Sequence, residues 1–436
     1  MNKITVIGAG LAGCEAAWIA ANSGIEVDLV EQKPTRKSVA HQSENFAELV
    51  CSNSLKAMRP NSAAGMLKAE MARFNSLCVE AAYKNQVAAG GALAVNRENF
   101  SDYITQKIKN HPMINVINRE QTEIPSGIVI IATGPLTQGD FAKSLSKITG
   151  DYLSFYDAAA PIITVESIDK AKTFTASRYD RGDADYINCP MNKAEYEEFY
   201  NALISAETAP ISDDDKCGFY EGCMPIEVLA KRGIDSVRYG AMKPVGLINP
   251  ATGHRPWANI QLRKEDENGT LYNIVGFQTN LKFGEQKRVF SMIPGLENAE
   301  FMRYGVMHRN TFINAPKLLN DDYSLKSDPQ IYFAGQITGV EGYMESAQSG
   351  IMAGLNAVRK ILDKEKIVLP QTTMIGAFQK YISSWQAKDY QPMGANIGIL
   401  PPLNELIKSK ADRYMAFYER SAHNLTEHLQ KIGEFQ

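Results

Sequence analysis

Short apolar runs bounded by glycines open the chain. Lys3–Ile7 (KITVI) leads directly into Gly8–Gly13 (GAGLAG), an alanine-rich segment continues to Gly24, and Ile25–Val30 (IEVDLV) is the next apolar run. Such runs are typical of buried strands in a parallel sheet, and the alanine-rich segment between them has the length of a helix. The pattern therefore predicts a strand, a glycine turn, a helix and a second strand.

Similar apolar runs recur far along the chain. Ile124–Gly134 (IPSGIVIIATG) is one, and Gln330–Gly335 (QIYFAG) is another, which opens into a glycine-rich loop and a long helix with small residues on one face. Elements of one sheet thus bracket the middle of the chain. We expect an α/β fold with a split Rossmann-type domain of residues 1–155 and 300–436, and an inserted smaller mixed α/β domain of residues 156–299.

Composition supports a multidomain globular protein. The chain has 436 residues, 44% apolar and 22% charged, which argues against disordered, collagen-like and coiled-coil classes. Lys and Arg total 46 against 49 Asp and Glu, a net charge of −3, so a polyanionic partner would need a locally basic surface. The start MNKITVIGAG has no signal-peptide pattern and no apolar run could span a membrane, so we expect a cytoplasmic protein without membrane association.

Six cysteines are spread without regular spacing, and we expect them to be reduced. The closest pair, Cys217 and Cys223, has neither zinc nor redox spacing and no nearby histidine, so no metal is assigned.

The first glycine turn has the chemistry of a dinucleotide site. Gly8 permits the tight turn, Gly10 allows close approach of a pyrophosphate, Gly13 allows helix and strand to pack, and Glu31 lies 21 residues beyond Gly10, where a ribose-binding acid is expected. The alternative is a glycine turn that binds no nucleotide. Three such elements suit an extended FAD better than nicotinamide alone. The residues expected to contact it here are Gly8, Ala9, Gly10, Leu11, Ala12, Gly13, Glu31, Thr133, Gly134, Gly335 and Gln336.

Eight segments together resemble the glucose-inhibited-division family of flavoproteins, and within it the folate- and FAD-dependent methyltransferases of RNA uracil. They are IGAGLAGCEAAW, LVCSNSLK, GALAVNR, IIATGPLT, FYEGCMPIE, MKPVGL, VGFQTNLKFGEQKRVF and YFAGQITGVEGYMESAQSG. The resemblance runs essentially end to end. It implies methylation of uracil C5 in tRNA, at the T-loop uridine, with methylenetetrahydrofolate as donor and FAD reduced by NADH or NADPH. Gln336 stands where many FAD enzymes have an acid, and would bind through its amide.

Methylation at C5 requires a thiolate that adds to uracil C6, because C5 is only weakly nucleophilic. Cys223 precedes Pro225, which fits the first turn of a helix running to Ala230, and a helix N-terminus lowers a thiol pKa. Cys51 precedes Ser52–Ser54, which are expected to cap a helix. The resemblance implies that Cys223 adds to C6 and that Cys51 lies close to the flavin, with the division of roles left open. We expect the remaining cysteines to be buried small side chains: Cys14, Cys78, Cys189 and Cys217.

Other side chains are candidates for folate and RNA. The resemblance makes Gly342, Tyr343 and Met344 a wall of the pterin pocket, with ordinary loop packing as the alternative for Tyr343. Arg97 is expected to bind a folate glutamate or a phosphate, unless it is a solvated surface arginine. Residues 231–288 contain ten basic and five acidic side chains with aromatic residues between them, which is typical of RNA contact as well as of a solvated face. The expected RNA contacts are Arg232, Arg238, Arg255, Lys282 and Arg288.

Competing functions remain open. Ribosomal RNA is an alternative substrate for the same chemistry. A sister flavoprotein modifies wobble uridine with aminomethyl-type groups, usually with a GTPase, but is longer at its carboxyl end. A flavin disulfide reductase would need a CxxC or Cx4C pair, which the sequence lacks. A non-enzymatic nucleotide-binding protein is the last alternative. No obligate protein partner is predicted.

Overall fold

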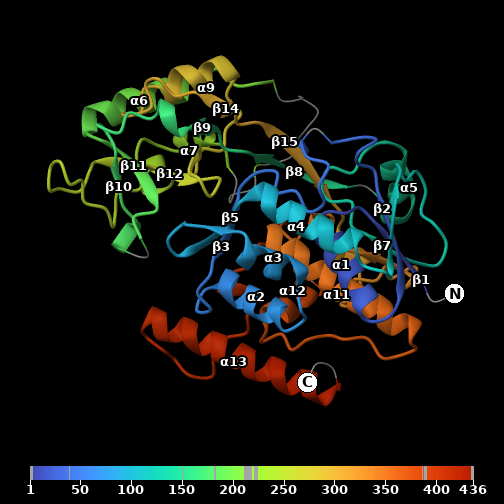
Figure 1. Cartoon of the computed structure of the whole chain (residues 1–436). Helices are drawn as coiled ribbons and strands as arrows, with labels where there is room; N and C mark the ends of the chain where they lie inside the picture. Colours follow the sequence, from blue (N-terminus) through green and yellow to red (C-terminus); the bar gives the residue numbers. More distant parts are fainter. Residues whose placement is uncertain are drawn as a thin grey trace.

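A parallel five-stranded sheet, ordered β16-β7-β1-β2-β6, forms the centre of the larger part of the molecule (Figure 1). The computed structural model describes residues 3–38, 40–150, 152–180, 183–210, 219, 224–384, 386 and 390–433. The sheet strands are β1 (Lys3–Ile7), β2 (Glu26–Glu31), β6 (Ile114–Asn118), β7 (Ile128–Ile131) and β16 (Ile331–Phe333). Every pair of neighbours is parallel. The α/β fold expected from the apolar runs is confirmed.

Helices cover this sheet, and small side chains allow two of them to pack closely together. α1 (Leu11–Asn22) lies against α11 (Tyr343–Ile361), and both helices are almost wholly buried. The other helices of this part are α2 (Ala63–Ala72), α3 (Leu77–Lys84), α4 (Arg97–Lys109), α5 (Gly139–Thr149), α10 (Ala315–Leu318), α12 (Met374–Ser384) and α13 (Lys410–Lys431). A small antiparallel sheet, β3-β5-β4, is made by β3 (Ser54–Ala57), β5 (Ala92–Val95) and β4 (Gln86–Val87).

A second body carries an antiparallel sheet with strand order β10-β11-β12-β13-β9-β14. The strands are β9 (Ile162–Thr164), β10 (Phe174–Thr175), β11 (Tyr186–Met191), β12 (Ala258–Lys264), β13 (Leu271–Ile274) and β14 (Phe301–Arg303). Its helices are α6 (Lys193–Ser205), α7 (Ile226–Ala230), α8 (Ser236–Tyr239) and α9 (Phe283–Phe290). Short 3-10 turns occupy Val165–Ser167 and Arg178–Asp180 in this body, and Gln336–Thr338 and Ile397–Ile399 in the larger one. Among the described residues, the hydrophobic core of the second body is formed by side chains between Ile163 and Phe301.

Two strands connect the bodies. β8 (Leu153–Ala158) leads into the second body, β15 (Met307–Phe312) returns from it, and the two pair antiparallel between the bodies (Figure 1). We call the second body the inserted domain. The predicted boundaries at residues 155/156 and 299/300 stay predictions.

One local expectation is wrong. Ser52–Ser54 do not cap a helix, because Ser54 begins the strand β3, which pairs with β5.

The described helices include none that is long and apolar enough to cross a membrane. Within the same described ranges, no three His, Cys, Asp or Glu side chains are grouped to hold a metal.

Candidate active site

The first glycine turn ends β1 and begins α1. Gly8 has φ +98°, in the region that favours glycine, and a Cβ on Gly13 would lie 1.8 Å from the Gly8 carbonyl oxygen. A Cβ on Gly10, in contrast, would meet nothing within 4 Å. The turn therefore packs tightly on its protein side and leaves Gly10 open on the side of a cavity, as pyrophosphate binding requires.

Glu31 ends β2 beside this turn. Its carboxylate accepts hydrogen bonds from the backbone N–H of Ala9, at 2.6 Å, and of Lys33, at 2.9 Å. Glu31 is 6% exposed and lines the cavity. These contacts place a fixed acceptor at the end of β2, where a ribose hydroxyl would be bound.

A cavity of about 600 Å³ runs between the three nucleotide-type elements. Its lining includes residues of the β1–α1 turn, of the end of β7 and of the loop before α11. It brings together twelve of the predicted cofactor residues: Gly8, Gly10, Leu11, Ala12, Glu31, Thr133, Gly134, Gly335, Gln336, Gly342, Tyr343 and Met344. Ala9 and Gly13 belong to the same turn but are not among the residues that line the cavity: Ala9 donates to Glu31, and Gly13 packs against Gly8. The arrangement fits an extended dinucleotide such as FAD.

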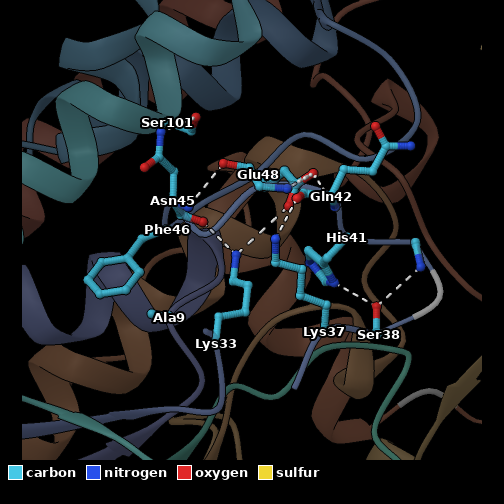
Figure 2. A network of polar contacts seen from close by, with 12 residues as sticks. Ala9, Lys33, Lys37, Ser38, His41, Gln42, Asn45, Phe46, Glu48 and Ser101 are labelled. Atoms are coloured by element: carbon cyan, nitrogen blue, oxygen red, sulfur yellow. Dashed lines mark hydrogen bonds and ion pairs between the residues drawn. The ribbon is translucent and has the colours of Figure 1, made fainter. Parts of the chain in front are cut away.

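A basic segment after β2 (residues 33–37), which the sequence analysis missed, contributes Lys33, Arg36 and Lys37 to the lining of this cavity. Figure 2 shows the polar contacts of Lys33 and Lys37. The Lys33 ammonium donates to the carbonyl of Asn45 at 2.5 Å, and the Lys37 ammonium donates to that of Gln42 at 2.7 Å. The Glu48 carboxylate accepts a hydrogen bond from the backbone N–H of Gln42 at 2.9 Å. The signal that predicts this wall is the KPTRK run, whose positive charges suit a pyrophosphate.

Cys51 lies in the cavity wall beside Tyr343. The Tyr343 hydroxyl accepts hydrogen bonds from the backbone N–H of Cys51, at 2.8 Å, and of Ser52, at 3.1 Å. Burial raises the pKa of the Cys51 thiol to about 12, with a further increase from the negative charge of Asp157. Cys51 therefore keeps its proton at neutral pH in this arrangement.

Carboxyl and amide side chains form another part of the wall, and the sequence analysis did not identify them. Asp157, Gln278, Asn310 and Glu341 line the cavity together with Gln336. Burial raises the pKa of Glu341 to about 8, and the charge of Asp157 adds to the shift. The Gln336 amide donates to Glu341 at 2.8 Å. The buried Asn310 Oδ1 has no hydrogen-bond partner among the described residues, so this wall has acceptor capacity for a bound heterocycle.

Cys223 lies outside the described residues. The helix predicted after it is present as α7, and Pro225 directly precedes that helix. The expected burial is confirmed for Cys14, Cys78 and Cys189, each 0% exposed, whereas Cys217 also falls outside the described residues.

The predicted contacts for folate and RNA lie in different surroundings. Arg97 is mostly buried, ion-paired to Glu265 at 2.7 Å, and is not in the cavity lining. Arg238 stacks on Trp257, 4.0 Å from guanidinium carbon to ring centroid.

The remaining predicted RNA contacts are at the surface of the inserted domain. Lys282 and Arg288 form exposed ion pairs with Glu207 and Glu285. Arg232 and Arg255 are exposed. Arg97 is thus mostly buried, whereas these four side chains lie on the surface of the inserted domain.

Comparison with known proteins agrees with this architecture. The family model for Glucose inhibited division protein A matches residues 3–365. The Methylenetetrahydrofolate--tRNA-(uracil-5-)-methyltransferase TrmFO of Acetivibrio thermocellus is 56% identical over 435 residues, covering 99% of this chain and 100% of that protein. The protein of the same name from Anoxybacillus flavithermus is 54% identical over 431 residues, with 99% and 100% covered.

A solved structure shares the fold. Aquifex aeolicus GidA, in its form II crystal, superposes with a TM-score of 0.71 at 16% identity, over 98% of this chain and 73% of the GidA chain. Because the family model spans most of the chain and the relatives match it from end to end, this chain belongs to the glucose inhibited division protein A family of flavoproteins.

Proposed function

We propose that this chain catalyses methylenetetrahydrofolate-dependent methylation of uracil C5 in tRNA, at the T-loop uridine, with FAD as cofactor and NADH or NADPH as reductant. The observation that carries the proposal is the full-length similarity to proteins named for this reaction, 56% identical in one case. The similarity covers 99% of this chain and 100% of that relative. The cavity is consistent with the flavin that the reaction needs.

When bound, FAD supplies reducing equivalents and carries the one-carbon unit from folate to uracil. Residues for holding it are Gly10 at the open turn, Glu31 at the ribose position and the basic segment at Lys33 and Lys37. The carboxyl and amide wall around Glu341 offers donors and acceptors that suit the polar edge of a pterin or of the flavin ring.

Two thiols divide the work on uracil. The Cys223 thiolate forms a bond to C6, and the displaced electron pair makes C5 nucleophilic toward the one-carbon unit. Loss of the C5 proton then expels the thiolate and restores the double bond between C5 and C6. Because the transferred carbon is at the methylene level, conversion to methyl would also need a hydride equivalent from the reduced flavin as the bond between this carbon and its carrier breaks. Cys51 supports a different role, because burial raises its pKa to about 12 and it is a poor resting nucleophile. It suits proton transfer close to the flavin.

The inserted domain is the proposed RNA surface. Its exposed cations Arg232 and Arg255, and the Arg238–Trp257 stack, combine backbone neutralisation with an aromatic face. Tyr239 is 71% exposed beside this stack, with the Arg238 guanidinium 5.4 Å from its ring centroid.

The decisive experiment is nucleoside mass spectrometry of an unmodified tRNA transcript. The protein is incubated with NADH and methylenetetrahydrofolate carrying a heavy methylene carbon, beside labelled S-adenosylmethionine as the alternative donor. Heavy 5-methyluridine from folate alone is the expected result. Label from neither donor would contradict the tRNA assignment, and parallel reactions with ribosomal RNA and with a wobble-uridine substrate would then identify the alternative.

The nucleophile is tested separately with 5-fluorouracil-containing tRNA, which traps the C6 adduct. We expect a covalent protein–RNA species for the parent protein and for Cys51→Ala, and none for Cys223→Ala. An adduct that persists in Cys223→Ala would exclude Cys223 as the nucleophile.

A further inference from the structure

The loop that carries Cys51 is held by the inserted domain. We call residues 49–53 the thiol loop. Arg263, near the end of β12, donates from Nε to Asn53 Oδ1 and from Nη2 to Ser52 Oγ, each at 2.9 Å. Asn53 Nδ2 donates back to the Lys264 carbonyl at 2.9 Å. Arg263 and Asn53 are 6% and 0% exposed, so these bonds lie in the interior, away from competing water.

Glu265, just beyond β12, acts on the same loop through Arg97. Its carboxylate accepts from Arg97 at 2.7 and 3.2 Å. Arg97 in turn donates to the carbonyl oxygens of Leu49, at 3.0 Å, and Cys51, at 3.3 Å.

Arg303, at the end of β14, donates to the Val50 carbonyl at 2.7 Å. Three consecutive carbonyl groups of the thiol loop are therefore bound by guanidinium groups, and three of the residues involved belong to the inserted domain: Arg263, Glu265 and Arg303.

Burial of these guanidinium groups costs free energy unless their hydrogen bonds to the thiol loop and to Glu265 are kept. Three buried or half-buried guanidinium groups face one carboxylate, and burial lowers the pKa of both Arg263 and Arg303. Buried charges are tolerated only where hydrogen bonds replace their lost hydration. Here those bonds are made to the loop that carries Cys51. Arg263 belongs to residues 231–288, which were expected to face RNA, but its side chain is buried.

We propose that Arg263, Arg303 and Glu265 are positioning residues that fix the orientation of Cys51 in the cavity wall from the inserted domain. A tRNA contact that shifts Arg263 or Arg303 would then change the orientation of Cys51 as well. The inference rests on the proposed function, in which Cys51 works beside the flavin and the inserted domain contacts RNA. It assigns a role to residues that touch neither substrate nor cofactor.

The test measures Cys51 directly. The FAD-loaded full-length protein is treated with iodoacetamide, and alkylation of each cysteine is followed by peptide mass spectrometry with and without unmodified tRNA. Arg263→Gln removes the guanidinium group that donates to Asn53 Oδ1 and Ser52 Oγ. We expect Cys51 to be alkylated about tenfold faster, because the loss of about 1.4 kcal/mol from the contacts that hold the thiol loop corresponds to a factor of about ten in its exposure to the reagent. Arg263→Lys, which can replace one donor, should recover part of the effect.

Arg178→Gln is the matched control. Arg178 is a half-buried arginine of the same domain, and it donates to Gln261 Oε1 at 2.7 Å and to the Val245 carbonyl at 2.9 Å rather than to the thiol loop. Cys14, Cys78 and Cys189 are fully buried and report general loosening. Unchanged Cys51 alkylation in Arg263→Gln overturns the proposal, as does an equal increase in Arg178→Gln.

Addition of tRNA should change the Cys51 rate in the parent protein by at least threefold and should not do so in Arg263→Gln. An equal tRNA response in both proteins would overturn the transmission step. Failure of the proposed reaction is recognised independently, since alkylation without tRNA requires no turnover and the nucleoside assay requires no alkylation.

Discussion

The hydroxyl of Tyr343, at the start of α11, accepts hydrogen bonds from the backbone N–H of Cys51 and of Ser52, which lie nearly three hundred residues earlier in the chain. Tyr343 therefore connects the last nucleotide element to the thiol loop, which the arginines of the inserted domain also hold. Both amides depend on this one oxygen, so its removal leaves two donors without their acceptor.

The Tyr343→Phe variant should expose those donors. We expect the thiol loop to open about ten times more often, since an unsatisfied buried donor costs about 1–3 kcal/mol. Hydrogen exchange of peptides covering residues 49–55 measures this directly. Tyr83→Phe, at a tyrosine that is 50% exposed, is the control. Equal exchange rates in the parent protein and Tyr343→Phe would show that the hydroxyl does not hold the loop.

Glu31→Gln should weaken FAD binding. The substitution keeps the shape of the side chain but turns an amide N–H2 toward the N–H donors of Ala9 or Lys33. We expect the dissociation constant for FAD to rise about tenfold, corresponding to the loss of about 1.4 kcal/mol. Flavin fluorescence during titration of the apoprotein measures it. Glu26→Gln, at the exposed start of the same strand, should bind FAD as the parent does; equal weakening in both variants would contradict the role of Glu31.

Sequence and structure agree best where the determinants are local. The apolar run of β1, the glycine turn and Glu31 lie within one continuous segment, so spacing alone encodes their geometry. The carboxyl and amide wall has no such signal. Asp157 and Asn310 come together only because β8 pairs with β15 across about 150 intervening residues. Arg97 shows the same limit, because its partner Glu265 belongs to another domain.

The contact between α1 and α11 depends on the absence of a side chain. A Cβ on Gly350 would lie 2.1 Å from the Ala12 carbonyl oxygen, which is backbone and cannot move aside cheaply. Gly350→Ala should therefore destabilise the protein by about 1–3 kcal/mol or more and reduce FAD loading, because Ala12 lines the cavity. Thermal unfolding and the flavin absorbance of the purified protein measure the two effects.

Gly284→Ala is the control for this substitution. Gly284 is exposed in α9, and an added Cβ would meet nothing within 4 Å. Its replacement should be neutral or slightly stabilising, since alanine favours helix. Comparable losses in both variants would exclude close packing as the cause.

Buried Glu70 should make stability depend on pH. It accepts hydrogen bonds from the backbone N–H of Met374, at 2.7 Å, and of Ile375, at 2.8 Å, and from the Ser421 hydroxyl at 2.6 Å. Burial nevertheless raises its pKa to about 7 from an ordinary value of 4.5. The folded state thus holds a proton that the unfolded state releases, so this contribution is complete below pH 4.5 and is lost as pH rises through 7.

The parent protein should lose on the order of 2 kcal/mol more stability than Glu70→Gln between pH 5.5 and 8.5, because glutamine does not titrate. Thermal midpoints of both proteins at the two pH values test this. The difference between the proteins isolates Glu70 from other buried acids such as Glu341. Parallel pH dependence in the two proteins would show that Glu70 does not change its protonation in this range.

The exposed cations of the inserted domain should differ in their effect on RNA. Arg255 is exposed and has no ion pair within the described ranges, whereas Arg288 donates to Glu285 at 2.6 and 3.0 Å. A phosphate contact by Arg255 releases counterions, so Arg255→Gln should reduce the slope of log affinity against log salt by about one. Arg288→Gln should change it less, because its charge is already shared with Glu285. Filter binding of unmodified tRNA from 50 to 200 mM salt measures both slopes, and identical slopes for the parent and Arg255→Gln would remove Arg255 from the RNA surface.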